Sequence, residues 1–172
     1  MNKETTNLMK NNIVLIGMPG VGKSTVGVIL AKIMGLRFTD ADLCIQEREG
    51  RLLKDIIAAD GVDRFIEIEG DVLSSLNVTR SVIATGGSAV YSARAMEKLK
   101  ETGTIVYLQL SFDELKNRLH DIKGRGVVLR DGQTLEDLYR ERIPLYESFA
   151  DITVKEDGLS PEETVEAIVK SL

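Results

Sequence analysis

The segment "GMPGVGKST" constrains this chain more than any other. It fits the pattern G-x-x-x-x-G-K-[ST] from Gly17 to Ser24, and it joins a short apolar run to a helical pattern. In such a turn, glycines let backbone N–H groups converge on phosphate, a lysine reaches the β/γ oxygens, and a serine hydroxyl binds Mg²⁺. The segment therefore predicts a nucleotide-binding turn made of Gly20, Val21, Gly22, Lys23, Ser24 and Thr25.

Strand and helix patterns alternate along the rest of the chain. The apolar runs predict strands at 13–17, 37–40, 81–85, 104–110 and 151–154. Helical spacing predicts helices at 23–34, 92–103, 111–119, 134–150 and 161–172, and two or three helices within 42–77. This alternation indicates an α/β fold with a parallel sheet and helices on both faces. Ligands of such sheets bind at the carboxyl ends of the strands.

Length and charge limit the class of protein. The 172 residues suffice for a single domain over 12–172, and the polar residues 1–11 predict a flexible leader. The formal net charge of −5 gives no bulk attraction for nucleic acid or an anionic membrane. The one cysteine, Cys44, excludes an intramolecular disulfide, and no apolar run reaches the length of a membrane span. We expect a cytoplasmic protein.

A P-loop leaves several enzyme classes open, and the sequence separates them in part. The N-K-x-D pattern that GTPases use to read guanine is missing from the chain. The size instead suits a kinase for a small molecule or a nucleotide. The glycine-rich, basic segment 121–133 predicts a mobile lid, which would exclude water during phosphoryl transfer from ATP.

Candidate acceptor groups follow the second and third predicted strands. Asp40 and Asp42 lie at the end of the second strand, where Asp40 could hold Mg²⁺ and Asp42 could orient an acceptor hydroxyl. Gly86 and Gly87 end the third strand and suit a close backbone approach to a ligand, although a tight turn alone would also explain them.

Several motifs, in this order, resemble those of the shikimate kinase family. They are "GMPGVGKST", "DAD", "GGSAV", "GRG" and "RIPLY", and the resemblance as a whole spans about Ile13 to Val154. The resemblance implies the P-loop NTPase fold of the nucleoside monophosphate kinase type, with a five-stranded parallel sheet in the order 2-3-1-4-5. It also implies ATP and Mg²⁺ as cofactors, and phosphorylation of the 3-hydroxyl of shikimate in aromatic amino-acid biosynthesis.

The resemblance also implies roles for individual residues. Ser24 binds the metal directly and Asp40 binds it through water. Lys23, Asp42 and Arg125 are the expected catalytic residues. Asp42, Gly86, Gly87 and Arg142 are expected to bind the acceptor, Arg142 through its carboxylate. Arg118 is expected along the adenine and Arg125, in the lid, at the phosphates.

Three positions depart from the family pattern. In the motif F-R-x-x-E, read here as "FIEIE", Ile66 replaces an arginine that would bind the acceptor carboxylate together with Arg142. Ser88 replaces a third glycine, and Gly126 replaces the proline after the lid arginine. Ile66 either packs in the core or turns an apolar side chain toward the acceptor.

The leading hypothesis is a shikimate kinase-like enzyme that acts as a monomer on a small hydroxylated acid. The first alternative is a related kinase for another hydroxylated acid or a polyol, because of Ile66. The second alternative is a nucleotide-binding regulator without turnover, although a degenerate regulator would be free to lose the P-loop and acidic residues that this chain retains.

Overall fold

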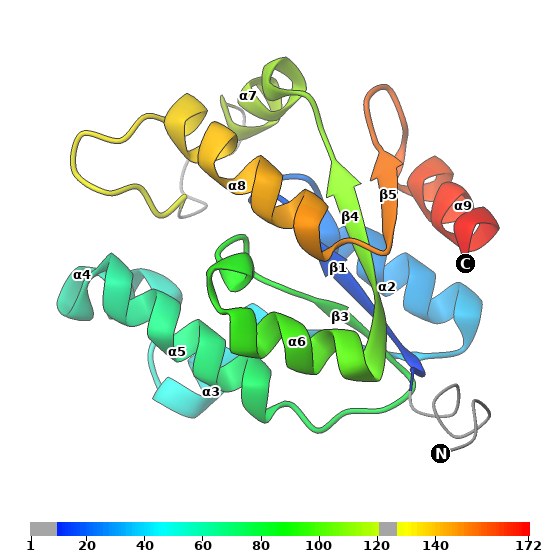
Figure 1. Cartoon of the computed structure of the whole chain (residues 1–172), viewed down its shortest axis with the longest axis horizontal. Helices are drawn as coiled ribbons and strands as arrows, with labels where there is room; N and C mark the ends of the chain where they lie inside the picture. The colour runs from blue at the N-terminus through cyan, green and yellow to red at the C-terminus, as the bar shows by residue number, and fades with distance from the viewer. Residues whose placement is uncertain (1–9, 121–126) are drawn as a thin grey trace.

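The computed structural model describes residues 10–120 and 127–172 as a five-stranded parallel sheet between two layers of helices (Figure 1). The strand order is β2-β3-β1-β4-β5. The strands are β1 (Asn12–Ile16), β2 (Arg37–Asp40), β3 (Ser81–Ala84), β4 (Gly103–Gln109) and β5 (Ile152–Lys155). The predicted fold class and strand order are both confirmed.

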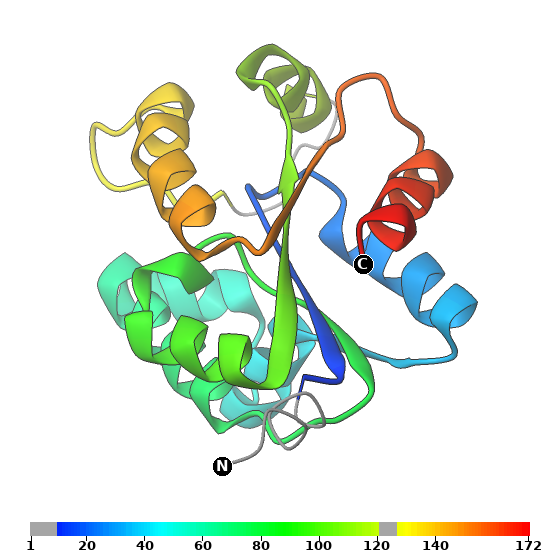
Figure 2. The same ribbon diagram turned by 45° about the vertical axis from the view of Figure 1, so that its right-hand side comes forward.

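The helices divide between the two faces of the sheet. They are α2 (Lys23–Met34), α3 (Ala41–Glu49), α4 (Leu53–Asp60), α5 (Val62–Ser75), α6 (Ala93–Thr102), α7 (Phe112–His120), α8 (Leu135–Phe149) and α9 (Pro161–Ser171), with a short 3₁₀ turn η1 (Ala89–Tyr91). Helices α2 and α9 cover one face, while α5, α6 and α8 lie on the other (Figure 2). None of the helices in the described ranges is long and apolar enough to cross a membrane.

The central strand β1 carries the core. All five of its residues are buried, and Val14 pairs in register with Ile83 of β3 and Ile105 of β4. A strand that is covered on both faces needs apolar side chains along its whole length, which explains the continuous run "IVLI".

The sequence predicted most element boundaries to within one residue. Helix α2 and strand β2 match their predicted ranges, and three helices, α3, α4 and α5, separated near Gly50 and Gly61, occupy the stretch where two or three were predicted. Helix α8 continues through Pro144. At α9, Ser160 and Glu163 form a reciprocal capping box.

The turns after β1, β2 and β3 meet at the carboxyl edge of the sheet. Gly17 follows β1, Asp40 ends β2, and Gly86 follows β3 after one intervening residue. The parallel pairing of these three strands therefore places the predicted nucleotide and acceptor residues next to one another.

Asn12 closes the opposite edge, where its side chain bonds one backbone group ahead of β3 and one at its first residue. Its amide donates to the Val78 carbonyl at 2.9 Å and accepts from the Ser81 N–H at 3.0 Å, and the residue is 3% exposed. We expect Asn12→Ala to lower the free energy of unfolding in urea by about 1–3 kcal/mol, because both groups lose a buried partner.

The neighbouring residue supplies a matched control. Asn11 is exposed, and its one side-chain hydrogen bond within the described residues is accepted from the Arg80 N–H at 3.2 Å. Asn11→Ala should therefore cost less than about 0.5 kcal/mol, as exposed substitutions usually do. Equal losses in the two variants would contradict a structural role for the buried amide.

Candidate active site

The turn from Gly17 to Gly22 forms a cradle of backbone groups at the start of α2. A Cβ atom at Gly17 would lie 2.6 Å from the Leu108 carbonyl oxygen, and the φ of Gly17 is +148°, so a side chain is excluded there. Gly22 precedes α2 with φ of 94°, and within residues 10–120 and 127–172 no side chain caps the helix. The first N–H groups of α2 therefore remain available for an anion.

Lys23 lies inside this cradle and is held by its carbonyl groups. Its ammonium donates to the Gly17 carbonyl at 2.8 Å and to the Met18 carbonyl at 2.9 Å. An ammonium has three protons, so one further donor remains for a phosphate oxygen. Burial lowers the pKa of Lys23 to about 8, although the Asp42 carboxylate opposes this shift.

Ser24 and Asp40, the two residues expected at the metal, are hydrogen-bonded to each other beside the cradle. The Ser24 hydroxyl donates to Asp40 Oδ2 at 2.7 Å, and the other oxygen, Oδ1, accepts from the Asp42 N–H at 2.9 Å. Within residues 10–120 and 127–172, no three His, Cys, Asp or Glu side chains gather as a metal site. One hydroxyl and one carboxylate fit Mg²⁺, which in kinases takes its remaining ligands from phosphate and water.

Asp42 points toward the third turn, where Gly86 and Gly87 leave no room for a side chain. A Cβ atom at Gly86 would collide with Glu69 Oε1 and would lie 3.3 Å from Asp42 Oδ1. Burial raises the pKa of Asp42, the Asp40 carboxylate raises it further, and Lys23 lowers it. The tight packing around Gly86 is enough to require a glycine at this position, whether or not a ligand binds there. The same packing brings the Gly86 backbone next to the Asp42 carboxylate.

Arg142 reaches the same turn from α8. A Cβ atom at Gly87 would lie 2.8 Å from Arg142 Nη1 and 2.7 Å from Pro19 Cδ. Arg142 is 2% exposed; its Nε donates to the Tyr91 hydroxyl at 3.3 Å, and its guanidinium lies 5.2 Å from the Tyr91 ring centroid. Among the described residues, no carboxylate lies within 4.0 Å of Arg142, so this buried cation suits an anionic ligand.

The other two predicted arginines have different outcomes. Arg118, on α7, donates from Nη1 to the Val21 carbonyl at 3.2 Å and so contacts the phosphate-binding turn. Arg125 and Gly126 lie outside the described residues. The described part of the predicted lid packs on α5 and α8, since Val128 contacts the apolar cluster around Phe65, and Arg130 pairs with both Asp63 and Glu141.

Sequence reasoning missed several buried polar residues of the site. Tyr146 donates to the Gly87 carbonyl at 2.6 Å, one helical turn after Arg142 within the motif "RIPLY". Glu69 is 0% exposed and accepts from the Ser88 hydroxyl. Glu156 follows β5, and burial raises its pKa to about 7, while Arg118 and Lys23 lower it. The helical spacing from Arg142 could have signalled Tyr146.

Ile66 packs in neither apolar cluster of the described residues. It is half-buried on α5, whereas its neighbours Phe65, Ile68 and Val72 form the core of the second cluster. Core packing therefore does not account for the isoleucine at this position.

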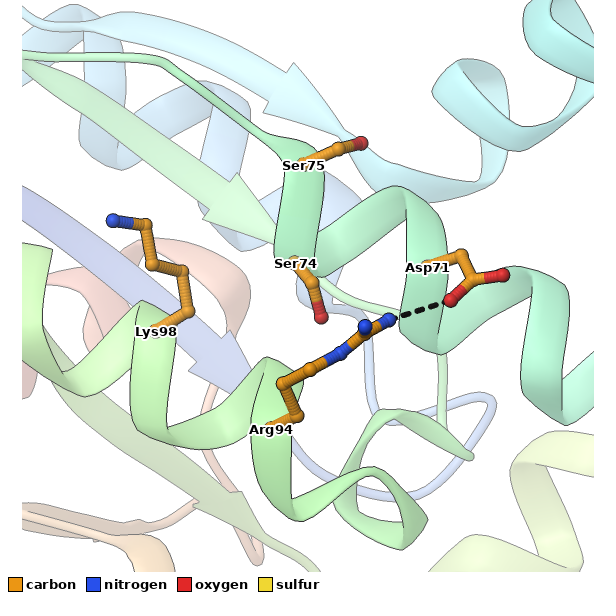
Figure 3. Close-up of a pocket in the computed structure, with 5 residues that line it drawn as sticks. All are labelled: Asp71, Ser74, Ser75, Arg94 and Lys98. Atoms are coloured by element: carbon orange, nitrogen blue, oxygen red, sulfur yellow. Dashed lines mark hydrogen bonds and ion pairs between the residues drawn. The ribbon is translucent and has the colours of Figure 1, made fainter.

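A separate hollow lies on the surface between α5 and α6 (Figure 3). It is lined by Asp71, Ser74, Ser75, Arg94 and Lys98, and Arg94 pairs with Asp71 at 2.5 Å. None of these residues belongs to the three turns, so the hollow is distinct from the candidate active site.

Comparison with known proteins gives the family of this chain. The family model "Shikimate kinase" matches residues 19–172. The shikimate kinase of Thermodesulfovibrio yellowstonii is 36% identical over 162 residues, which cover 92% of this chain and 93% of that protein. The chain belongs to the shikimate kinase family. It is therefore an ATP-dependent kinase that transfers phosphate to a hydroxyl group.

Solved structures agree with this family. A shikimate kinase from Acinetobacter baumannii in complex with shikimate superposes with a TM-score of 0.83 at 32% identity, covering 94% of this chain and 92% of that one. The enzyme from Aquifex aeolicus gives 0.75 at 33% identity, with 93% and 94% covered. A gluconokinase from Sinorhizobium meliloti is 18% identical, with a TM-score of 0.51 and 95% and 94% covered, and shares the fold alone.

The buried charge of Lys23 predicts a pH-dependent stability. With a pKa near 8 in the folded chain and 10.5 as the ordinary value, the folded state binds fewer protons than the unfolded state between these pH values. Stability rises with pH wherever the unfolded state binds more protons. We expect wild type to gain free energy of unfolding relative to Lys23→Met as the pH rises from about 8 to 10.5.

Urea unfolding at a series of pH values measures this difference. Lys32→Met makes the same charge change at an exposed position of α2. The free energy of unfolding of wild type relative to Lys32→Met should therefore stay nearly constant over the same pH interval. A difference between wild type and Lys23→Met that stays flat across the interval would show that the ammonium is not buried as described.

Proposed function

We propose that this protein transfers the γ-phosphoryl group of ATP to the 3-hydroxyl of shikimate. The observation that carries the proposal is the position of Arg142, a buried cation without a carboxylate partner among the described residues, next to the Gly86–Gly87 turn. Asp42 lies at the other side of that turn. A hydroxylated acid bound there would place its carboxylate at Arg142 and a hydroxyl at Asp42.

The residues of the P-loop would hold the nucleotide. The free N–H groups of α2 would bind the β-phosphate, Lys23 would donate to the β/γ oxygens, and Arg118 would lie along the adenine. Ser24 and Asp40 would hold Mg²⁺, which neutralises phosphate charge when it is bound. Arg125 of the lid would approach the γ-phosphoryl group, where a cation stabilises the charge of the transition state.

Asp42 would act on the acceptor. Its carboxylate would accept a hydrogen bond from the 3-hydroxyl and would take the proton as the oxygen forms its bond to phosphorus and the bond to ADP breaks. Burial and the neighbouring Asp40 carboxylate both raise the pKa of Asp42.

The proposal also covers the oligomeric state of the protein and the cell compartment in which it acts. We propose a monomeric, single-domain enzyme over 12–172 that acts in the cytoplasm without a nucleic acid or membrane partner. The net charge of −5 and the single cysteine support this reading. Light scattering on the purified protein tests the monomer.

An ADP-release assay with Mg-ATP tests the activity, with shikimate, gluconate and simple polyols as acceptors. Among these acceptors, we expect turnover with shikimate and not with gluconate or the polyols. Faster turnover with another acceptor would contradict the proposed substrate, and turnover that survives Lys23→Ala in a folded protein would contradict the proposed nucleotide site.

The two aspartates should respond differently to loss of charge. We expect Asp42→Asn to lower kcat by about 10²–10⁴-fold with Mg-ATP binding nearly unchanged, because the variant loses only the proton acceptor. Asp40→Asn should instead raise the Mg²⁺ concentration needed for half-maximal activity. The measurements are steady-state kinetics and Mg²⁺ titration, and identical phenotypes would mean that the pair acts as one metal site.

Ile66 tests the acceptor side. If shikimate is the acceptor, Ile66→Arg adds a second cation for its carboxylate, and kcat/KM for shikimate should rise about tenfold, as for one charge-assisted hydrogen bond. Ile33→Arg adds the same charge at an exposed position of α2, 62% exposed, and should change nothing. A lower kcat/KM in Ile66→Arg would indicate an acceptor without a carboxylate at this place.

A further inference from the structure

Two departures from the family pattern meet at one buried carboxyl group. Ile66 precedes Glu69 by three residues on α5, so the two side chains lie on neighbouring turns of one helix face. Ser88 follows the Gly86–Gly87 turn, and its hydroxyl donates to Glu69 Oε2. The sequence therefore lacks an arginine on one side of Glu69 and has a hydroxyl on the other.

The surroundings of Glu69 show why it needs a partner. Glu69 is 0% exposed, and its second oxygen, Oε1, has no hydrogen-bond partner among the described residues. The charged groups that face it are Asp42 of α3, Arg142 of α8 and Lys23 of α2. None of these forms an ion pair with Glu69 within 4.0 Å in the described part of the chain, so Ser88 is the group that bonds it.

Burial and the Ser88 hydrogen bond shift the pKa of the Glu69 carboxyl group in opposite directions. Burial raises the pKa of Glu69 to about 7, while the Ser88 hydrogen bond lowers it. A buried acid costs free energy unless a cation or a hydrogen-bond donor satisfies it. An isoleucine at position 66 offers neither, whereas the Ser88 hydroxyl does.

We propose that Ser88 replaces the missing arginine at position 66 as the partner of Glu69, and that the Ser88–Glu69 pair holds the Gly86–Gly87 turn in the form that binds the acceptor. The inference rests on the proposed function for its acceptor. Glu69 Oε1 packs directly against Gly86, so a shift of the carboxyl moves the backbone that lies beside Asp42. Ser88 is a positioning residue, and the acceptor is a hydroxylated acid whose carboxylate meets Arg142.

The pair predicts that positions 66 and 88 depend on each other. Ser88→Ala should raise KM for shikimate about tenfold, the equivalent of one hydrogen bond to a charged group, with kcat and KM for ATP within about twofold. In the Ile66→Arg background, the new arginine can bond Glu69, so adding Ser88→Ala should raise KM for shikimate by less than about twofold. Steady-state kinetics of wild type, the two single variants and the double variant measure this coupling.

Matched variants separate positioning from general destabilisation. Ser88→Thr keeps the hydroxyl and should retain KM within about threefold, whereas Ser148→Ala removes an exposed serine hydroxyl of α8 and should change nothing. If Ser88→Ala raises KM equally in both backgrounds, or raises KM for ATP as much as KM for shikimate, the proposal is wrong.

A substrate-free measurement distinguishes this inference from the proposed function. Urea unfolding of the same four proteins reports the coupling between positions 66 and 88 whatever the acceptor is. Coupled unfolding in an enzyme that does not phosphorylate shikimate would reject the proposed function and retain the pair. Additive unfolding and additive KM in an enzyme that does phosphorylate shikimate would reject the pair alone.

Discussion

The parallel pairing of β1 with β3 and of β3 with β2 brings together the three turns that carry the phosphate-binding residues, the two aspartates and the Gly86–Gly87 pair. Because these strands run in one direction, the turns that follow β1 and β3 end at the same edge, and β2 brings Asp40 to that edge by pairing with β3. Backbone hydrogen bonds of the sheet thus bring together residues that are about 70 positions apart in the sequence. The part of the candidate active site that lies on these turns follows from the strand order, whereas Arg142 and Glu69 reach it from helices α8 and α5.

The side chains then place an unusual amount of charge in a small buried volume. Lys23, Glu69 and Arg142 are all buried, and Asp42 is half-buried beside them. Each of these groups loses hydration on folding. This loss lowers the pKa of Lys23 and raises the pKa of Asp42 and of Glu69. Such a cluster contributes little to stability, but it presents fixed charges to the phosphates of a nucleotide and the carboxylate of an acceptor.

The sequence predicted the parts of the site that depend on local pattern. The phosphate-binding turn, Asp40 and Gly86 follow predicted strands, so the alternation of elements already placed them together. The bonds from Ser88 to Glu69 and from Tyr146 to Gly87 could not be predicted, because each joins residues from elements whose packing angle no local pattern specifies. The role expected for Arg125 stays a prediction, because it lies outside the described residues.

Helix α8 connects the described part of the predicted lid to the Gly86–Gly87 turn. At its start, Thr134 and Asp137 bond each other's backbone N–H groups, so the preceding loop ends at a capped helix. Near its other end, Tyr146 fastens the helix to the Gly87 carbonyl. Arg142 precedes Tyr146 by one turn of the same helix, so the hydrogen bond from Tyr146 to the Gly87 carbonyl also sets how far the guanidinium lies from that turn. A shift of the Gly87 carbonyl would therefore carry the buried cation with it, so that the two parts of the acceptor site move together.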